Sequence, residues 1–106
     1  MFSVSEQDWR TFKEKIPIWQ ERHMANLCDD YRELLSADAN ASEKFWMLEK
    51  RVRIDQKSSS VSVKMKRSNA FFCILELLTD HIITEEDLIG FSSELIASVM
   101  SALRNH

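Results

Sequence analysis

Apolar residues recur at intervals of three and four along roughly the first third of the chain. The positions of this stripe are Trp9, Phe12, Ile16, Trp19, Leu27, Tyr31 and Leu34, with His23 in the same phase. That spacing is typical of one face of a helix. Ser5 is a candidate N-cap residue, with Asp8 three positions later. We therefore predict a helix over residues 5–36.

Pro17 interrupts this stripe without shifting its phase. A proline inside a helix removes one backbone hydrogen bond and clashes with the carbonyl four residues earlier. Because the apolar positions keep their register on both sides, we predict a helix kinked at Pro17, or two nearly collinear helices broken there. A sharp reversal of the chain is disfavoured.

A second helix is predicted over residues 41–57, and its apolar residues fall on two sides. The stripe expected to face inward is Phe45, Leu48 and Val52. Met47 and Ile54 lie seven residues apart on nearly the opposite side. A helix with two apolar sides is either central in its bundle or presents one side to a partner. The pattern leaves both alternatives open.

The third predicted helix covers residues 61–80 and contains the most apolar run of the chain, between Phe71 and Leu78. We expect this run to form the most buried helix. Residues 61–66 alternate between apolar and polar positions, which is also a short strand pattern. A start near Val61 is favoured because a lone strand would have no partner, with Ser68 as the later alternative.

The last predicted helix covers residues 84–105 and begins at Thr84, with Asp87 three positions later. Gly90 leaves two alternatives. The helix passes through it, at a cost of about 1 kcal/mol relative to Ala. Otherwise a short helix ends at Gly90, and Ser92 caps a new one.

Composition supports an all-α fold. The 106 residues include one Gly and one Pro, whereas sheet proteins need turn residues repeatedly and helical bundles need few. The length suits one domain with its own core. We therefore expect a compact bundle of four to five helices, with residues 1–106 forming a single helical domain.

The cysteines and the apolar runs suggest a cellular compartment. Cys28 and Cys73 stand in apolar, helix-like settings, which favours reduced thiols over a disulfide. The sequence has no apolar run long enough for a signal peptide or a membrane span. We expect a cytoplasmic protein that does not associate with a membrane.

Motifs for metal, nucleotide or catalytic chemistry are missing from the sequence. Its three histidines, His23, His81 and His106, have no ligand-like spacing to each other or to a cysteine. With Gly90 as the only glycine, a phosphate-binding loop is excluded. Cys28 is followed by the acidic Asp29 and Asp30, a setting that does not favour a catalytic thiolate. We expect no cofactor and no metal, and an enzyme is disfavoured.

Charge is unevenly distributed. Residues 44–67 hold 8 basic and 2 acidic side chains, whereas residues 68–106 hold 1 basic and 6 acidic ones. The candidate surface for an anionic partner is Lys50, Arg53, Lys57, Lys64, Lys66 and Arg67, with Trp46 as a possible stacking face. The alternative is that the acidic flanks neutralise this segment within the fold. The formal net charge of −3 favours that alternative.

Two stretches together resemble short, uncharacterised helical proteins of Firmicutes-type bacteria. They run from Ser42 to Arg51 and from Ile83 to Leu95. The matching residues are mainly helix caps and apolar core positions. This resemblance implies a helical fold of about this length and no activity.

Three functional hypotheses follow from the sequence. The first is a small interaction protein without catalytic activity that self-associates, with Met47 and Ile54 in the interface. The second is binding of nucleic acid or another polyanion through residues 44–67. The third is a small-ligand binder or enzyme with an apolar pocket near Trp19, His23 and Trp46.

Overall fold

The computed structural model describes residues 3–58 and 61–105. These residues form four α-helices, which are α1 (Glu6–Leu35), α2 (Ala41–Gln56), α3 (Ala70–Thr79) and α4 (Ser93–Arg104). Two short 3-10 helices, η1 (Arg67–Asn69) and η2 (Glu85–Leu88), precede α3 and α4. Within the described ranges there is no β-strand, and the prediction of an all-α fold is confirmed.

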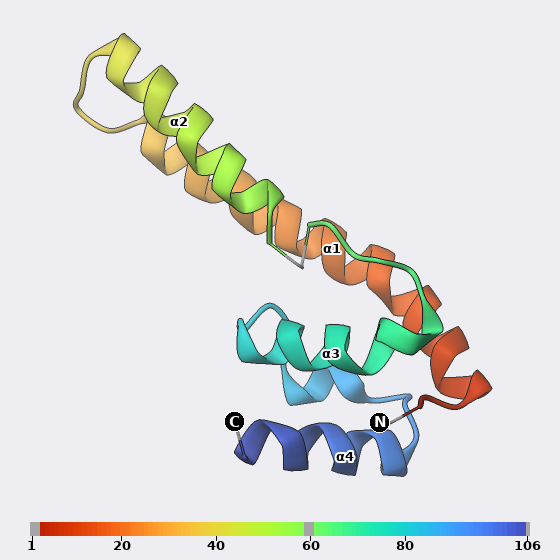
Figure 1. Ribbon diagram of the computed structural model, residues 1–106. Coiled ribbons are helices and arrows are strands. Elements are labelled where there is room, and N and C mark those ends of the chain that lie inside the picture. The colour runs from red at the N-terminus through yellow and green to blue at the C-terminus, as the bar shows by residue number, and fades with distance from the viewer. Residues whose placement is uncertain (1–2, 59–60, 106) are drawn as a thin grey trace.

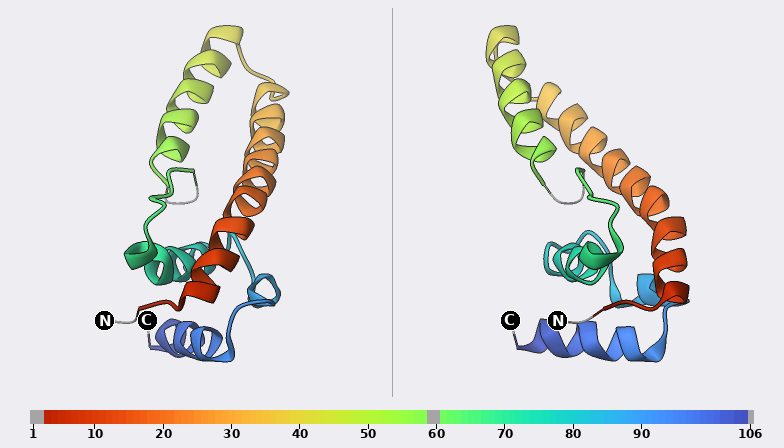
Figure 2. Two further views of the ribbon diagram at one scale, coloured as in Figure 1. Left: turned by 90° about the vertical axis from the view of Figure 1, so that its right-hand side faces the viewer. Right: turned by 45° about the vertical axis from the view of Figure 1, so that its right-hand side comes forward.

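The helices divide into two regions (Figure 1). The first half of α1 packs with α3, η2 and α4 into what we call the globular region. The second half of α1 and all of α2 form a hairpin that projects from it, which we call the arm and define as residues 20–56 (Figure 2). The molecule is accordingly elongated, with extents of 52 × 26 × 22 Å. The prediction of a compact bundle is therefore wrong, because α2 lies along α1 alone.

The helix α1 is unbroken from Glu6 to Leu35 and runs through Pro17. Figure 2 shows it curving gently along its length. Pro17 and Lys13 are both exposed, so water can satisfy the carbonyl that loses its helical partner. Of the two alternatives, two helices broken at Pro17 are wrong, whereas a kink at Pro17 is not confirmed and stays a prediction. The unchanged phase of the apolar stripe reflects one continuous helix.

The main hydrophobic cluster of the described residues lies in the globular region. It comprises Val4, Phe12, Ile16, Trp19, Ala70, Phe71, Ile74, Leu77, Leu78, Ile83, Leu88, Phe91, Leu95 and Val99. Five of the ten residues of α3 are buried, which confirms that the apolar run between Phe71 and Leu78 forms the most buried helix. At the base of the arm the Trp19 and Phe91 rings lie 6.2 Å apart.

The predicted helix start near Val61 is wrong. The described residues 61–66 are not helical, and the first helical turn begins at Arg67, close to the later alternative at Ser68. This segment carries the chain from the end of the arm back to the globular region. An extended residue spans about 3.3 Å and a helical one 1.5 Å, so the return requires extended chain. The Arg67 Nε donates to the Val4 carbonyl at 3.0 Å and anchors its end.

Gly90 ends the fourth predicted helix early. Its φ of +106° lies in a region that glycine adopts readily and other residues avoid. The chain turns there, and Ser92 caps α4 by accepting from the Leu95 amide at 3.1 Å. Of the two alternatives, the one with a new helix after Gly90 is therefore confirmed, and a single helix over 84–105 is wrong.

Candidate functional site

Polar contacts hold α2 against α1 in the arm. The Tyr31 hydroxyl donates to Asp55 Oδ2 at 2.6 Å. The Arg51 guanidinium bridges the two helices, because it donates to Asp55 of α2 at 3.2 Å and to Asp30 of α1 at 3.3 Å. Leu27 is the one buried apolar residue of the arm, and α2 contains no buried residue at all. The arm is therefore a helical hairpin with almost no core of its own.

The environment of Tyr31 keeps its hydroxyl protonated. Desolvation, followed by the hydrogen bond to Asp55, raises the pKa of Tyr31 to about 12. The phenol therefore remains a donor to the carboxylate across the physiological pH range. The Arg51 guanidinium also lies 6.0 Å from the centre of the Tyr31 ring, which adds a cation–π contact to the same cluster.

The distal tip of the arm exposes three consecutive apolar side chains. Phe45, Trp46 and Met47 are 59%, 64% and 52% exposed, and the first two rings meet edge to face at 5.0 Å. The first turns of α2 extend beyond the end of α1 (Figure 1). The prediction that Phe45 faces inward is therefore wrong, because α1 ends before it could cover that position. Trp46 is likewise a surface residue.

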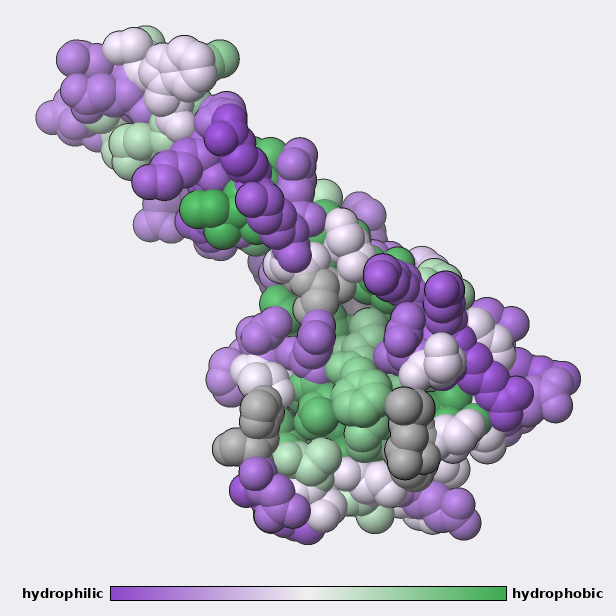
Figure 3. All heavy atoms as spheres, viewed as in Figure 1, coloured by the Kyte–Doolittle hydropathy of each residue, from purple (hydrophilic) through white to green (hydrophobic). Residues whose placement is uncertain are grey.

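One side of the hairpin carries an apolar surface, which we call the apolar flank. It comprises Met24, Cys28 and Leu35 of α1 with Phe45, Leu48 and Val52 of α2. At about 100° per residue, the three α1 residues lie on the other side of α1 from Asp30, and Phe45 and Val52 lie at least a quarter turn from Arg51 on α2. Leu48 is half-buried between them and α1. A shallow hollow of about 320 Å³ runs along α2 there, lined partly by Phe45, Leu48 and Val52. Figure 3 shows apolar patches between the hydrophilic side chains of the arm.

The predicted interface residues lie elsewhere on the same helix. Met47 and Ile54 are 52% and 58% exposed, and helical spacing places them on the opposite side of α2 from the apolar flank. The alternative that α2 is central in its bundle is wrong, since α2 buries no residue. Both apolar sides of α2, the one with Phe45 and the one with Met47 and Ile54, are therefore exposed to solvent in the single chain.

The basic residues of α2 form a stripe on the surface that faces away from α1. By helical spacing, Lys50, Arg53 and Lys57 share this side with Trp46. Arg53 pairs with Glu49 one turn earlier. Within residues 3–58 and 61–105, neither Lys50 nor Lys57 makes an ion pair. Arg51, by contrast, is neutralised inside the arm by Asp30 and Asp55. Acidic side chains of the fold therefore neutralise only part of the basic segment, and the stripe of Lys50 and Lys57 stays exposed without acidic partners in the described residues.

The three basic residues after the arm have different surroundings. Lys64 lines a hollow of about 380 Å³ together with Lys57, so these two cations are brought close. Lys66 is exposed. Arg67 donates to the Val4 carbonyl and thereby helps to hold the fold together. Of the six predicted anion-binding residues, the structure brings Lys50, Arg53, Lys57 and Lys64 toward one region.

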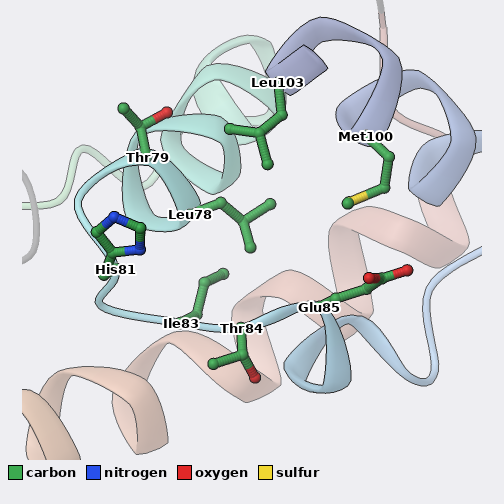
Figure 4. Close-up of a pocket in the computed structure, with 8 residues that line it drawn as sticks. All are labelled: Leu78, Thr79, His81, Ile83, Thr84, Glu85, Met100 and Leu103. Carbon is green, nitrogen blue, oxygen red and sulfur yellow. The ribbon is translucent and has the colours of Figure 1, made fainter.

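The apolar pocket expected near Trp19, His23 and Trp46 is not formed. Trp19 is buried in the globular region at 3% exposure, whereas Trp46 stands at the distal end of the arm. A cavity of about 650 Å³ instead lies where α3 and α4 end (Figure 4). It is lined by Leu78, Thr79, His81, Ile83, Thr84, Glu85, Met100 and Leu103. Sequence spacing could not have found it, because two stretches of the chain, residues 78–85 and 100–103, line it together.

Both cysteines are free thiols in different settings. Cys28 is exposed on the arm, and Cys73 is half-buried in α3. Burial, with a smaller contribution from Glu76, raises the pKa of the Cys73 thiol to about 11. Cys73 is therefore a poor nucleophile, and Cys28 is the accessible thiol. In the described part of the chain, no three His, Cys, Asp or Glu side chains are grouped so as to hold a metal ion.

Comparison with known proteins identifies no relative. No protein family, curated protein or solved structure matches this chain. The resemblance to helical proteins of Firmicutes-type bacteria stays a prediction. Among the described helices, none has the length and apolar character needed to cross a membrane.

Proposed function

We propose that this protein is a small interaction module that self-associates through its arm, with two hairpins packing on their apolar flanks as an antiparallel four-helix bundle. The observation that carries this proposal is that α2, 16 residues long, buries no residue. An isolated helix of that length is marginal in water, and most helices in proteins depend on packing of an apolar face. A second layer of helices would supply the packing that the single chain leaves out.

The size of the apolar flank fits a dimer interface. A 16-residue helix is about 24 Å long, and two adjacent helices of about 10 Å each present a face of roughly 500 Å² per copy. Two copies would bury about 1,000 Å², which is near the lower bound for a specific interface. A four-helix bundle is the usual way in which two hairpins cover one face each.

Symmetry supports the same arrangement. In a two-fold dimer the same surface of both copies meets, so the surface must complement itself. The six residues of the apolar flank carry no charge, and the nearest charged pair, Glu49 with Arg53, is neutral as a unit. The basic stripe of α2 faces away from α1 and would stay at the outer side of the bundle. Two copies can therefore approach without bringing like charges together.

Light scattering coupled to size exclusion tests self-association. We expect the wild-type chain to be a dimer at micromolar concentration and the variant Phe45→Ser to be a monomer. Phe72→Ser is the matched control, because Phe72 is similarly exposed at 50% but lies on α3. A monomeric wild-type chain at high micromolar concentration would overturn the proposal.

Cross-linking locates the interface. Cys28 belongs to the apolar flank, while the raised pKa of Cys73 suppresses its reaction. A bifunctional maleimide with a short spacer should therefore give a covalent dimer through Cys28, and Cys28→Ser should abolish it. A dimer that is still cross-linked in Cys28→Ser and lost in Cys73→Ser would contradict pairing through the arm.

Binding of a polyanion is a second candidate function, favoured by the open basic stripe. Lys50 and Lys57 have no acidic partner in the described residues, and Trp46 offers an exposed ring beside them. The double variant Lys50→Gln/Lys57→Gln should elute from heparin at lower salt than the wild-type chain. The control is Lys13→Gln, which removes an exposed lysine from the globular region. Absence of wild-type retention at low salt would exclude this function.

A further inference from the structure

The cavity at the ends of α3 and α4 has an apolar floor and a polar rim. Leu78 and Ile83, 6% and 2% exposed, are its most buried lining residues. Met100 and Leu103 of α4 line it from the other side while remaining half-buried. Figure 4 shows these four side chains converging on one space, with His81 and Glu85 on opposite sides of it. Its volume of about 650 Å³ falls within the range of small-molecule sites.

The lining of this cavity includes one acidic side chain, Glu85, and no Lys or Arg. Every residue that lines it lies between positions 78 and 103. Residues 68–106 hold Arg104 as the one Lys or Arg, against six Asp or Glu residues. Of these, Asp87 is neutralised by Arg22, whose guanidinium donates to both carboxylate oxygens at 3.0 and 2.9 Å. Glu85 makes no ion pair in the described part of the chain, so its carboxylate is free to pair with a bound cation.

The wall of the cavity at His81 has an unusual backbone. His81 has a φ of +59°, the left-handed conformation that usually belongs to glycine. It closes α3 by donating to the Leu78 carbonyl at 3.1 Å, while Ile82 donates to the Leu77 carbonyl at 2.9 Å. Glycine would fit this end of the helix without strain. These two hydrogen bonds are the usual way in which a left-handed residue ends a helix, and the turn places an imidazole opposite Glu85.

We propose that this cavity binds a small amphiphile with an apolar body and a cationic head, such as an alkylammonium ion. The body would lie against Leu78, Ile83, Met100 and Leu103, and the head would reach the Glu85 carboxylate at the rim. Charge complementarity selects the cation, because an anionic head would meet an unpaired carboxylate in an acidic segment. This site is separate from the arm and does not depend on self-association.

Three probes with one tail separate the contributions of charge and apolar contact. Octylammonium, octanol and octanoate are titrated below their micellar concentrations into the ¹⁵N-labelled full chain. We expect saturable amide shifts at Ile83, Met100 and Leu103, with octylammonium binding at least about fivefold more tightly than octanoate. Shifts confined to α2, or equal affinity for the cation and the anion, would overturn the proposal.

Two pairs of variants test the site itself. Glu85→Gln should reduce the preference for octylammonium over octanoate severalfold, whereas Glu86→Gln makes the same charge change outside the lining and should preserve most of it. Leu103→Trp fills the cavity and should weaken all three probes, whereas Ser101→Trp adds the same ring at an exposed position of α4. Thermal unfolding of each variant confirms that it is folded. The site in this cavity would be contradicted if Glu85→Gln and Glu86→Gln changed the cation preference equally, or if Leu103→Trp and Ser101→Trp weakened binding equally.

Discussion

The globular region and the arm are both built from amphipathic helices, yet they use their apolar residues in different ways. In the globular region α3 buries five residues against α1, η2 and α4. In the arm, α2 buries none and exposes Phe45, Trp46, Met47 and Ile54. The same helical pattern therefore specifies a core in one region and a surface in the other. What differs is the number of neighbouring helices within reach.

The largest expected effect separates the two regions by stability. Phe12 is fully buried, so Phe12→Ala should lower the free energy of unfolding by about 3–5 kcal/mol. Phe45→Ala makes the same change in the arm at 59% exposure, and for the monomer it should stay within about 0.5 kcal/mol. Urea unfolding at concentrations that dissociate any dimer measures both. Equal losses would show that the arm also contributes to the core.

The next effect concerns the joint between the start of α1 and the start of α4. Asp8 is 2% exposed and accepts from the Ser92 amide at 2.8 Å and from the Ser92 hydroxyl at 2.6 Å. Asp8→Ala should cost about 1–3 kcal/mol, because it removes both bonds and leaves the Ser92 amide without that acceptor. Glu6→Ala is the control, since Glu6 is exposed in the same helical turn. Both variants are compared by chemical unfolding. A larger loss of unfolding free energy in Glu6→Ala than in Asp8→Ala would contradict the role of Asp8 in joining α1 to α4.

A smaller effect is expected inside the arm. Tyr31→Phe removes the donor to Asp55 and should destabilise the hairpin by about 0.5–1.5 kcal/mol. Because the arm has almost no core, the loss should be local. Amide hydrogen exchange should quicken in α2 and remain unchanged in α3. Uniformly faster exchange over both helices would mean that the arm and the globular region unfold as one unit.

The smallest effect is a pH dependence at the base of the arm. The hydrogen bonds from Arg22 lower the pKa of Asp87 below its ordinary value of 3.8. Because the pKa of Asp87 is lower in the folded chain than in the unfolded chain, its ion pair stabilises the fold fully at a pH above the unfolded-state pKa. This stabilisation is lost as the pH falls through the folded-state pKa. Arg22 is 46% exposed, so we expect less than about 1 kcal/mol. The free energy of unfolding should therefore drop less between pH 7 and pH 3 in Asp87→Asn than in the wild-type chain. Urea unfolding of both proteins at the two pH values measures this.

Local signals along the sequence predicted most of the helices. The stripe through Trp9 and Phe12 identified α1, and Thr84, Ser92 and Gly90 marked the ends of later elements because caps and turns depend on neighbouring residues. The sequence missed the extended return over residues 61–66. Its alternating pattern was ambiguous, and only the distance between the arm and the globular region requires extended chain there.

The candidate surfaces were predicted less completely than the helices. Met47 and Ile54 were expected to mark either a partner face or a central helix, and their exposure removes the second alternative. The spacing of Lys50 and Lys57 predicted that they share one side of the helix, but it did not predict that this side is exposed. Phe45 was assigned to the inward side, because the sequence does not indicate where α1 ends relative to α2.

By itself, the sequence determined the helical periodicity, the caps and the segregation of charge along the chain, since each depends on residues close together in sequence. Only the tertiary structure decided which apolar faces are covered. Burial depends on how many helices meet at a point, and α2 meets one while α3 meets several. The cavity beside His81 and Glu85 is likewise a tertiary feature, because its walls come from segments that become neighbours only when the chain folds.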